Sequence, residues 1–284
     1  MKLLIAGSKG QLAREIAAQA ADAGYEVEGF DVDELSISDF GAVVRKVSAA
    51  KPDLLINCAA YNNVDGAEQD WENAFLANGI GVKNLAIASA EAGAVFVHYG
   101  TDFVFNGEKR VPYTIADMPD PISSYGQSKL LGEELLQAHG TNYYLIRTSW
   151  LFGDGAFSFP LKVQEWAAKN DKLRIVDDQV ASPTYCADLA EATLKLVKTG
   201  AFGLYHITNS GHCSRYEWAR HILEVIGWKG TLEPAKSAEF KTPARRPEYS
   251  VLDNFPLQQT IGSLLPSWQD ATERFIRKTK ESGK

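Results

Sequence analysis

The sequence has few of the features that mark secreted, membrane or disulfide-stapled proteins. Its 284 residues include only three cysteines, Cys58, Cys186 and Cys213, and their spacing matches no disulfide or metal motif. Such usage is typical of a reducing compartment, so we expect free thiols and a cytoplasmic protein. No apolar run approaches the roughly 18 residues of a membrane span, and the first apolar stretch is too short for a signal peptide. We therefore expect neither.

Positive charge is also scarce. The chain has 29 Lys and Arg against 36 Asp and Glu, a net charge of -7, and it contains no basic run. This balance argues against nucleic acid and anionic membranes as partners. The five histidines do not show the two-ligand helical spacing, with acids nearby, of a metal site. We expect no catalytic metal.

The sequence does contain alternating strand and helix patterns. Hydrophobic residues make up 45% of the chain, enough for a sizeable core. Apolar strand patterns cover residues 3–6, 25–30, 54–57, 94–99, 143–148 and 204–207. Helical patterns cover 11–23, 38–49 with Ser38 as N-cap, 67–92, 125–137 and 187–198. This alternation predicts an α/β protein with a Rossmann-type doubly wound parallel sheet, whose ligands bind at the carboxyl ends of the strands.

The strict alternation weakens after about residue 150, which suggests two parts. We expect residues 1–150 to form a dinucleotide-binding domain, with a later segment at about 180–198 returning to it. Residues 151–284 are expected to form mainly a smaller α/β substrate-binding domain. The stretch 241–247, rich in Pro, Arg and Lys, is expected to be a loop.

A glycine-rich turn separates the first strand from the first helix. Its sequence, Gly7-Ser8-Lys9-Gly10-Gln11-Leu12-Ala13, has the spacing Gly-x-x-Gly-x-x-Ala. Such a turn lets a phosphate approach the backbone and the free N–H groups of the helix start. Asp31 ends the second strand about 20 residues later, where a dinucleotide fold places an acid for the ribose hydroxyls. Together the turn and Asp31 predict dinucleotide binding.

Tyr125 and Lys129 form a Tyr-x-x-x-Lys pattern within a predicted helix. Residues four apart lie on one helix face, so both side chains can reach the same space. A free tyrosine has a pKa of about 10, and we expect the nearby ammonium of Lys129 to lower it. The pair would then serve as a general acid/base.

With these residues in place, the chain resembles the extended short-chain dehydrogenase/reductases over essentially its whole length. Within that family it is most similar to the reductases of dTDP-linked 4-keto sugars. The matching motifs, in chain order, are Gly10-Gln11-Leu12, Ala59-Ala60-Tyr61, Val64-Asp65, Ala67-Glu68, Thr101-Asp102-Phe103-Val104-Phe105, Tyr125-Gly126-Gln127-Ser128-Lys129, Arg147-Thr148-Ser149-Trp150, Asp178-Gln179, Ser182-Pro183-Thr184, and Arg246-Pro247 followed by Ser250.

The resemblance implies a role for each matching site residue. Tyr125 would protonate the substrate carbonyl oxygen, Lys129 would hold the nicotinamide ribose, and Thr101 would hydrogen-bond the reacting oxygen. Cofactor-binding residues would be Gly7, Gly10, Gln11, Leu12, Asp31, Asp39, Phe40, Ala59, Ala60, Tyr61, Asn62, Tyr125 and Lys129. Substrate-binding residues would be Thr101, Asp102, Tyr125 and Trp150.

The function that the resemblance implies is NAD(P)H-dependent reduction of dTDP-4-dehydro-L-rhamnose to dTDP-L-rhamnose, a precursor of cell-surface polysaccharides. The cofactor would be NADPH or NADH, the substrate a dTDP-sugar, and the protein a monomer or homodimer. Tyr61-Asn62 and Ala13 depart from the family's commoner residues and leave cofactor preference open. A contact of Arg245 or Arg246 with the nucleotide diphosphate, and Mg²⁺ at a dimer contact as in some relatives, also stay open.

Two other functions remain compatible with the motifs. Sugar-nucleotide dehydratases share this fold, but their Thr-Asp-Glu motif carries an acid where this chain has Phe103. Epimerases share the fold as well. Regulatory subunits of methionine adenosyltransferase also resemble the family and can keep the Tyr/Lys pair without catalysing a reaction.

Overall fold

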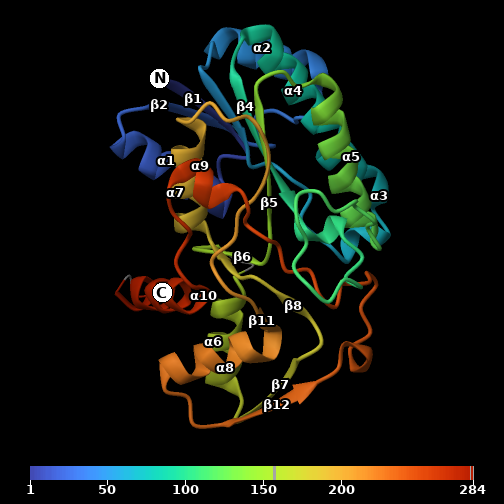
Figure 1. The fold of residues 1–284 in the computed structure, drawn as a ribbon, viewed down its shortest axis with the longest axis vertical. Helices are drawn as coiled ribbons and strands as arrows, with labels where there is room; N and C mark the ends of the chain where they lie inside the picture. Colours follow the sequence, from blue (N-terminus) through green and yellow to red (C-terminus); the bar gives the residue numbers. More distant parts are fainter. Residues whose placement is uncertain (156–157, 282, 284) are drawn as a thin grey trace.

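A six-stranded parallel sheet organises the computed structural model, which describes residues 1–155, 158–281 and 283 (Figure 1). The strand order is β10-β5-β4-β3-β1-β2. The strands are β1 (Lys2–Ala6), β2 (Glu26–Phe30), β3 (Leu54–Asn57), β4 (Val95–Thr101), β5 (Tyr143–Thr148) and β10 (Gly203–His206). The chain reverses direction across the sheet between β1 and β3, the switch point at which such folds bind ligands. The predicted doubly wound α/β fold is confirmed.

Helices cover both faces of this sheet. One face carries α1 (Gln11–Asp22) and α7 (Cys186–Val197), which pack against each other; the other carries α2 (Phe40–Ala50), α4 (Gly81–Ala92) and α5 (Ser124–His139). Strand β1 shows why both faces are apolar. Leu3 and Ile5 belong to the core under α1 and α7, whereas Leu4 and Ala6 belong to the core under α2 and α4. Side chains alternate along a strand, so a strand buried on both faces is apolar throughout.

The long helical pattern at 67–92 is interrupted, and this interruption was not predicted. It consists of a 3₁₀ turn (Gly66–Glu68), α3 (Trp71–Phe75), a π-helical turn (Leu76–Ile80) and then α4. The prediction of Ser38 as a helix N-cap is wrong. The carboxylate of Asp39 accepts from the Ala42 N–H at 2.9 Å and caps α2, while the Ser38 hydroxyl donates to the Leu76 carbonyl at 3.2 Å.

Below the main sheet lie shorter elements around an aromatic core (Figure 1). The helices are α6 (Phe159–Lys169), α8 (Arg215–Ile226) and α10 (Trp268–Glu281). Three two-stranded sheets join β7 (Lys172–Val176) with β12 (Thr231–Ala235), β8 (Val180–Ala181) with β11 (Cys213–Ser214), and β6 (Leu151–Phe152) with β9 (Thr184–Tyr185). The short helix α9 (Leu257–Ile261) lies beside α7 instead. We call the shorter elements around the aromatic core the lower region.

The lower region is held together by stacked aromatic rings. Phe152 stacks on Tyr185 with ring centroids 5.3 Å apart, and it meets Trp218 and Phe275 edge to face. Aromatic pairs of this kind add roughly 1 kcal/mol each beyond the apolar area that they bury. Within the described residues, no helix combines the length and apolar character that a bilayer crossing requires.

Candidate active site

The glycine turn after β1 forms a cradle with the segment after β3. Gly7 has a positive φ of 75°, and a Cβ there would lie 2.5 Å from the backbone nitrogen of Ala59. Any larger residue would push the two segments apart. The N–H groups of Gly7 and Ser8 both donate to the Phe30 carbonyl, so the turn is also fixed to the end of β2.

The start of α1 is open to an anionic ligand. No side chain caps it at Gly10, so its first N–H groups lack a side-chain acceptor. Gln11 adds a buried side-chain oxygen that has no hydrogen-bond partner among the described residues. Asp31, just beyond β2, accepts from the Lys9 N–H at 2.9 Å and the Val32 N–H at 2.8 Å. The uncapped helix start suits a phosphate, and the Asp31 carboxylate suits the hydroxyls of a ribose.

The loop after β3 is clamped by a residue that the sequence did not single out. Asn78 lies in the π-helical turn, where its side-chain oxygen accepts from the Tyr61 N–H at 2.8 Å. Its amide group donates to the Tyr61 carbonyl and to the hydroxyl of Ser128, both at 3.0 Å. Ser128 precedes Lys129 on α5, so Asn78 ties the predicted cofactor loop to the predicted catalytic helix.

Tyr125 and Thr101 lie together at the end of β4. Tyr125 follows the N-cap Ser123 of α5, whose hydroxyl accepts from the Gly126 N–H at 3.1 Å. Burial raises the pKa of Tyr125 to about 12, although the hydroxyl of Thr101 opposes the shift. The prediction of a lowered pKa for Tyr125 is therefore wrong, because desolvation outweighs the contacts that favour the phenolate. The phenol keeps its proton at neutral pH.

Lys129 lies one helical turn further along α5 and is almost fully buried. Its ammonium donates to the Tyr99 carbonyl on β4 at 2.6 Å. Burial lowers the pKa of Lys129 to about 8, while the negative charge of Glu133 opposes the shift. Lys129 also faces Cys58 at the end of β3, directly before the residue that contacts Gly7. The structure thus brings Lys129 and the glycine cradle to one place.

Asp102 connects the end of β4 to the last third of the chain. It is 2% exposed, accepts from the Ser250 hydroxyl at 2.5 Å, and receives the Thr101 hydroxyl at 3.3 Å. Burial raises the pKa of Asp102 to about 6, and these hydrogen bonds oppose the rise. Asp102 also feels the positive charge of Arg215 in the lower region. The sequence predicted neither the hydrogen bond of Ser250 to Asp102 nor the presence of Arg215 near Asp102.

Trp150 lies where the main sheet passes into the lower region, and its backbone is strained. Its φ is 42°, which is uncommon for a residue with a large side chain. The indole stacks on Trp218 with centroids 5.8 Å apart, and the guanidinium of Arg215 lies 3.6 Å from the Trp150 ring centroid. This stack places a cation and a partly exposed aromatic face beside Asp102.

The remaining predicted residues are less closely tied to this cluster. Asp39 is exposed and caps α2, and the Phe40 side chain is 46% exposed. Asn62 is exposed, and the side chain of Leu12 on α1 is buried in the core between this helix and the sheet. Arg246 pairs with Asp65 at 2.7 Å, so it has a protein partner. The cofactor roles of Asp39, Phe40, Asn62 and Leu12 stay predictions.

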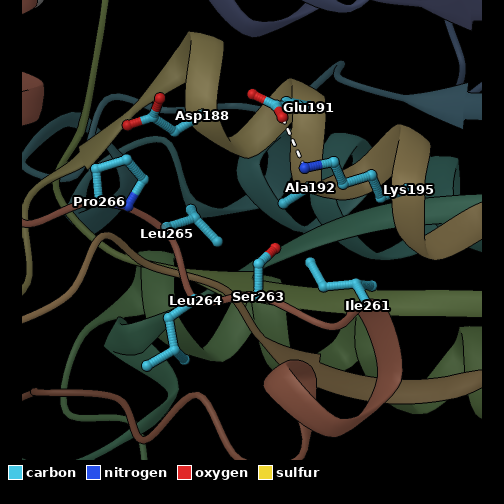
Figure 2. A pocket seen from close by; sticks show the side chains of 9 residues that line it. All are labelled: Asp188, Glu191, Ala192, Lys195, Ile261, Ser263, Leu264, Leu265 and Pro266. Atoms are coloured by element: carbon cyan, nitrogen blue, oxygen red, sulfur yellow. Dashed lines mark ion pairs between the residues drawn. The ribbon is translucent and has the colours of Figure 1, made fainter.

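A small pocket elsewhere contains none of the predicted site residues (Figure 2). It lies between α7 and the chain from α9 to α10, and the ion pair of Glu191 with Lys195 at 2.7 Å spans part of its rim. Across the described residues there is no group of three or more His, Cys, Asp or Glu side chains arranged for a metal ion.

The whole chain is similar to one family of known proteins. The model of the family described as RmlD substrate binding domain matches residues 1–281. The spore coat polysaccharide biosynthesis protein SpsK of Bacillus subtilis (strain 168) is 38% identical over 276 residues, which cover 97% of both chains.

Solved structures agree. A dTDP-4-dehydrorhamnose reductase from Clostridium acetobutylicum superposes with a TM-score of 0.96 at 39% identity, covering 99% of this chain and 100% of the other. The enzyme of the same name from Bacillus anthracis, in complex with NADP, gives 0.95 at 34% identity, covering 98% and 99%. The chain therefore belongs to the RmlD family, the dTDP-4-dehydrorhamnose reductases among the extended short-chain dehydrogenase/reductases.

Proposed function

We propose that this protein reduces the 4-keto group of dTDP-4-dehydro-L-rhamnose to give dTDP-L-rhamnose, with NADPH or NADH as the reductant. The observation that carries the proposal is the burial of Thr101, Tyr125 and Lys129 together at the end of β4. Family membership supports the same reaction, because relatives that match over the whole chain carry its name.

The cofactor would lie along the switch point of the sheet. Its phosphates would rest on the uncapped start of α1 beside Gly7 and Gly10, with Asp31 at the adenosine ribose. Lys129 would hold the nicotinamide ribose. When bound there, the reduced nicotinamide supplies the hydride for carbon 4 of the sugar.

Tyr125 would be the proton donor. As carbon 4 gains hydrogen, negative charge builds on its oxygen, and a proton or strong donor must meet it. The pKa of Tyr125 near 12 means that the phenol arrives protonated, ready to give its proton to that oxygen. The hydroxyl of Thr101 would donate a hydrogen bond to the same oxygen. The reaction would then yield the alcohol, the oxidised cofactor and the Tyr125 phenolate.

Lys129 would stabilise that phenolate. A phenolate in a buried site is costly unless a positive charge compensates it. The ammonium of Lys129, on the same helix face, supplies that charge below its pKa of about 8. A water-exposed group could then return the proton to Tyr125 before the next turnover.

The nucleotide end of the substrate would lie toward the lower region. Arg215 stacks on Trp150, and no carboxylate among the described residues forms an ion pair with it, although the charge of Asp102 acts on it. A guanidinium of this kind suits a diphosphate, which it can bind through two parallel hydrogen bonds. Trp150 offers its ring to the sugar.

The test is an assay with dTDP-4-dehydro-L-rhamnose and each reduced cofactor, following the loss of nicotinamide absorbance and identifying the product. We expect formation of dTDP-L-rhamnose with one cofactor oxidised per sugar. No oxidation at high enzyme concentration would contradict the proposal. Formation of a 4-keto-6-deoxy sugar from dTDP-glucose would instead support a dehydratase, although Phe103 cannot move a proton.

We further propose a cytoplasmic enzyme that acts as a monomer or homodimer, without nucleic acid or membrane partners. The acidic net charge of -7 supports the absence of polyanionic partners. Light scattering coupled to gel filtration, with and without Mg²⁺, would give the oligomeric state. A stable trimer or larger assembly would contradict this part.

A further inference from the structure

A buried ion pair lies directly behind Lys129, and neither the predicted reaction nor the cofactor cradle uses it. Glu133 on α5 and Arg147 on β5 are 1% and 3% exposed. Arg147 donates to one carboxylate oxygen of Glu133 through Nη2 at 2.7 Å and through Nε at 3.0 Å. Burying such a pair costs several kcal/mol of desolvation, and hydrophobic replacements are often no less stable. Stability alone is a weak reason for its presence.

The position of Glu133 links it to the catalytic lysine. It lies four residues after Lys129, hence on the same face of α5, and each side chain's charge acts on the other. Glu133 also reaches β4 at the point that carries the site. A Cβ on Gly100 would overlap the Glu133 carboxylate, so any larger residue between Tyr99 and Thr101 would have to displace that carboxylate.

Those neighbours of Gly100 both serve the site. The Tyr99 carbonyl holds the Lys129 ammonium at 2.6 Å, and Thr101 carries the hydroxyl that faces Tyr125. The carboxylate of Glu133 therefore lies against the short stretch of β4 that anchors Lys129 and precedes Thr101.

The other titratable groups around Lys129 do not supply a negative charge. From β3 it faces the thiol of Cys58, whose pKa burial raises. From β4 it faces His98, whose pKa burial holds well below its usual value, so the ring is neutral. Tyr125, one turn earlier on α5, is protonated. Burial raises the pKa of Glu133 as well, but the charges of Arg147 and Lys129 oppose the rise, so Glu133 is the one of these neighbours that is placed to carry a compensating negative charge.

We propose that Glu133, held in place by Arg147, is a positioning residue that keeps the buried ammonium of Lys129 charged and directed at the nicotinamide ribose. This inference rests on the proposed function, because it concerns the residue assigned to hold that ribose. It adds a second requirement to the Tyr-x-x-x-Lys pattern: an acid one turn after the lysine, with a buried arginine beside it.

The test measures the ionisation of Lys129 directly, without substrate. Protein labelled with ¹³C-lysine would be titrated by NMR, with the Lys129 Cε signal identified by its loss in Lys129→Arg. In the unchanged protein we expect a pKa of about 8. In Glu133→Gln, which keeps the shape and removes the charge, it should fall by about one unit or more, a tenfold change in the ionisation equilibrium.

Two matched variants distinguish charge from shape. Glu134→Gln makes the same change at the next, exposed position and should leave the Lys129 titration unaltered. Glu133→Asp keeps the charge, so Lys129 should stay charged at pH 7 even where the geometry loosens. Thermal unfolding of each variant would show that it is folded.

An unchanged Lys129 titration in Glu133→Gln overturns the inference and makes the pair merely structural. If Glu133→Gln does not fold, the inference is tested on Glu133→Asp and the unchanged protein. A neutral Lys129 at pH 7 in either of these two proteins also overturns the inference. Turnover separates this result from the function. A downward shift in a protein that reduces no dTDP-sugar would sustain the charge coupling of Glu133 to Lys129 and sink the proposed reaction.

Discussion

The main sheet and the lower region contribute different kinds of group to one site. The sheet and its helices carry the proposed acid, lysine and hydroxyl, on the regular elements β4 and α5. The lower region supplies a stacked cation, Arg215, and meets the sheet at a strained residue, Trp150. The proposed reaction chemistry would thus lie on regular sheet and helix structure, whereas the surface that would select the sugar nucleotide is built on aromatic packing.

This division predicts that the two functions fail separately. Changes on β4 and α5 should alter the rate of the chemical step, whereas changes around Trp150 and Arg215 should alter substrate affinity. Asp102 lies between them, because it follows Thr101 on β4 and accepts from Ser250 of the later chain. A variant that changed both parameters together would show that the regions act as one unit.

The largest effect should come from Tyr125→Phe. It keeps the ring, which packs edge to face on Phe103 with centroids 5.7 Å apart, so folding should change little. Loss of the proposed proton donor should lower kcat by about 10²–10⁴. Cofactor affinity should barely move.

Lys129→Ala should differ from Tyr125→Phe in its effect on the cofactor. It removes both the compensating charge and the proposed ribose contact, so it should weaken cofactor binding as well as slow turnover. Fluorescence titration of cofactor and single-turnover rates on both variants would check this. Near-normal turnover in Tyr125→Phe would contradict the mechanism and favour a regulatory role.

Asp102→Asn should raise the stability of the protein and lower its activity. The pKa of Asp102 is raised from 3.8 to about 6 in the folded protein, so folding favours its protonated form. Ionisation of this buried carboxyl therefore lowers the free energy of unfolding. The loss is absent below about pH 4, grows as the pH rises to about 6, and reaches its full size above pH 6. At pH 7.5 the variant should therefore gain up to about 3 kcal/mol in free energy of unfolding, with reduced turnover.

Chemical denaturation at several pH values would check this, since the gain should vanish near pH 4. Ser250→Ala is the matched control, because it leaves the buried carboxylate with one donor fewer and should lower stability at neutral pH. A loss of stability in Asp102→Asn at neutral pH would mean that its hydrogen bonds outweigh the desolvation of the charge.

How well the sequence predicted each region follows from the range of the interactions involved. Strands β1 to β5, the glycine turn and Tyr125 with Lys129 could be predicted, because local apolar runs, turn residues and helical spacing determine them. The π-helical turn could not, since it is stabilised by Asn78 reaching Tyr61 and Ser128 across the fold. The raised pKa of Tyr125 could not be predicted from the sequence either, because it depends on burial in the folded protein.

The lower region was poorly predicted for a similar reason. Its two-residue strands are too short for alternation, and tertiary aromatic contacts hold them. One local signal was available: Ser214 and Glu217 form a capping box at the start of α8, and that pattern identifies a helix N-terminus. It would have placed Arg215 on the first turn of a helix, but not its stacking on Trp150.

Arg215→Met should affect substrate affinity alone. It keeps an unbranched side chain against Trp150 and removes the charge, so KM for the dTDP-sugar should rise about tenfold to a hundredfold, the worth of a charged hydrogen bond. Kcat should change less than threefold. Arg215→Lys keeps the charge but loses the planar stack, and we expect an intermediate KM. Steady-state kinetics check both, and an unchanged KM in Arg215→Met would remove Arg215 from the proposed binding surface.

The smallest effect concerns the choice between NADPH and NADH, where the sheet region itself carries opposing charges. The carboxylate of Asp31 would repel a 2′-phosphate, but two backbone N–H groups already share that charge. The ammonium of Lys9 could attract the phosphate, but it is paired with Asp33 at 2.5 Å, and both side chains are exposed. Water and salt screen such exposed pairs, so neither charge should dominate. We therefore expect kcat/KM for the two cofactors to differ by less than about a hundredfold.

Lys9→Ala should shift the ratio toward NADH, and Asp33→Asn, which frees Lys9, should shift it toward NADPH, each by only a few fold. Added salt should shrink both shifts. Shifts in the same direction, or ones that ignore salt, would mean that cofactor choice is set elsewhere in the cradle.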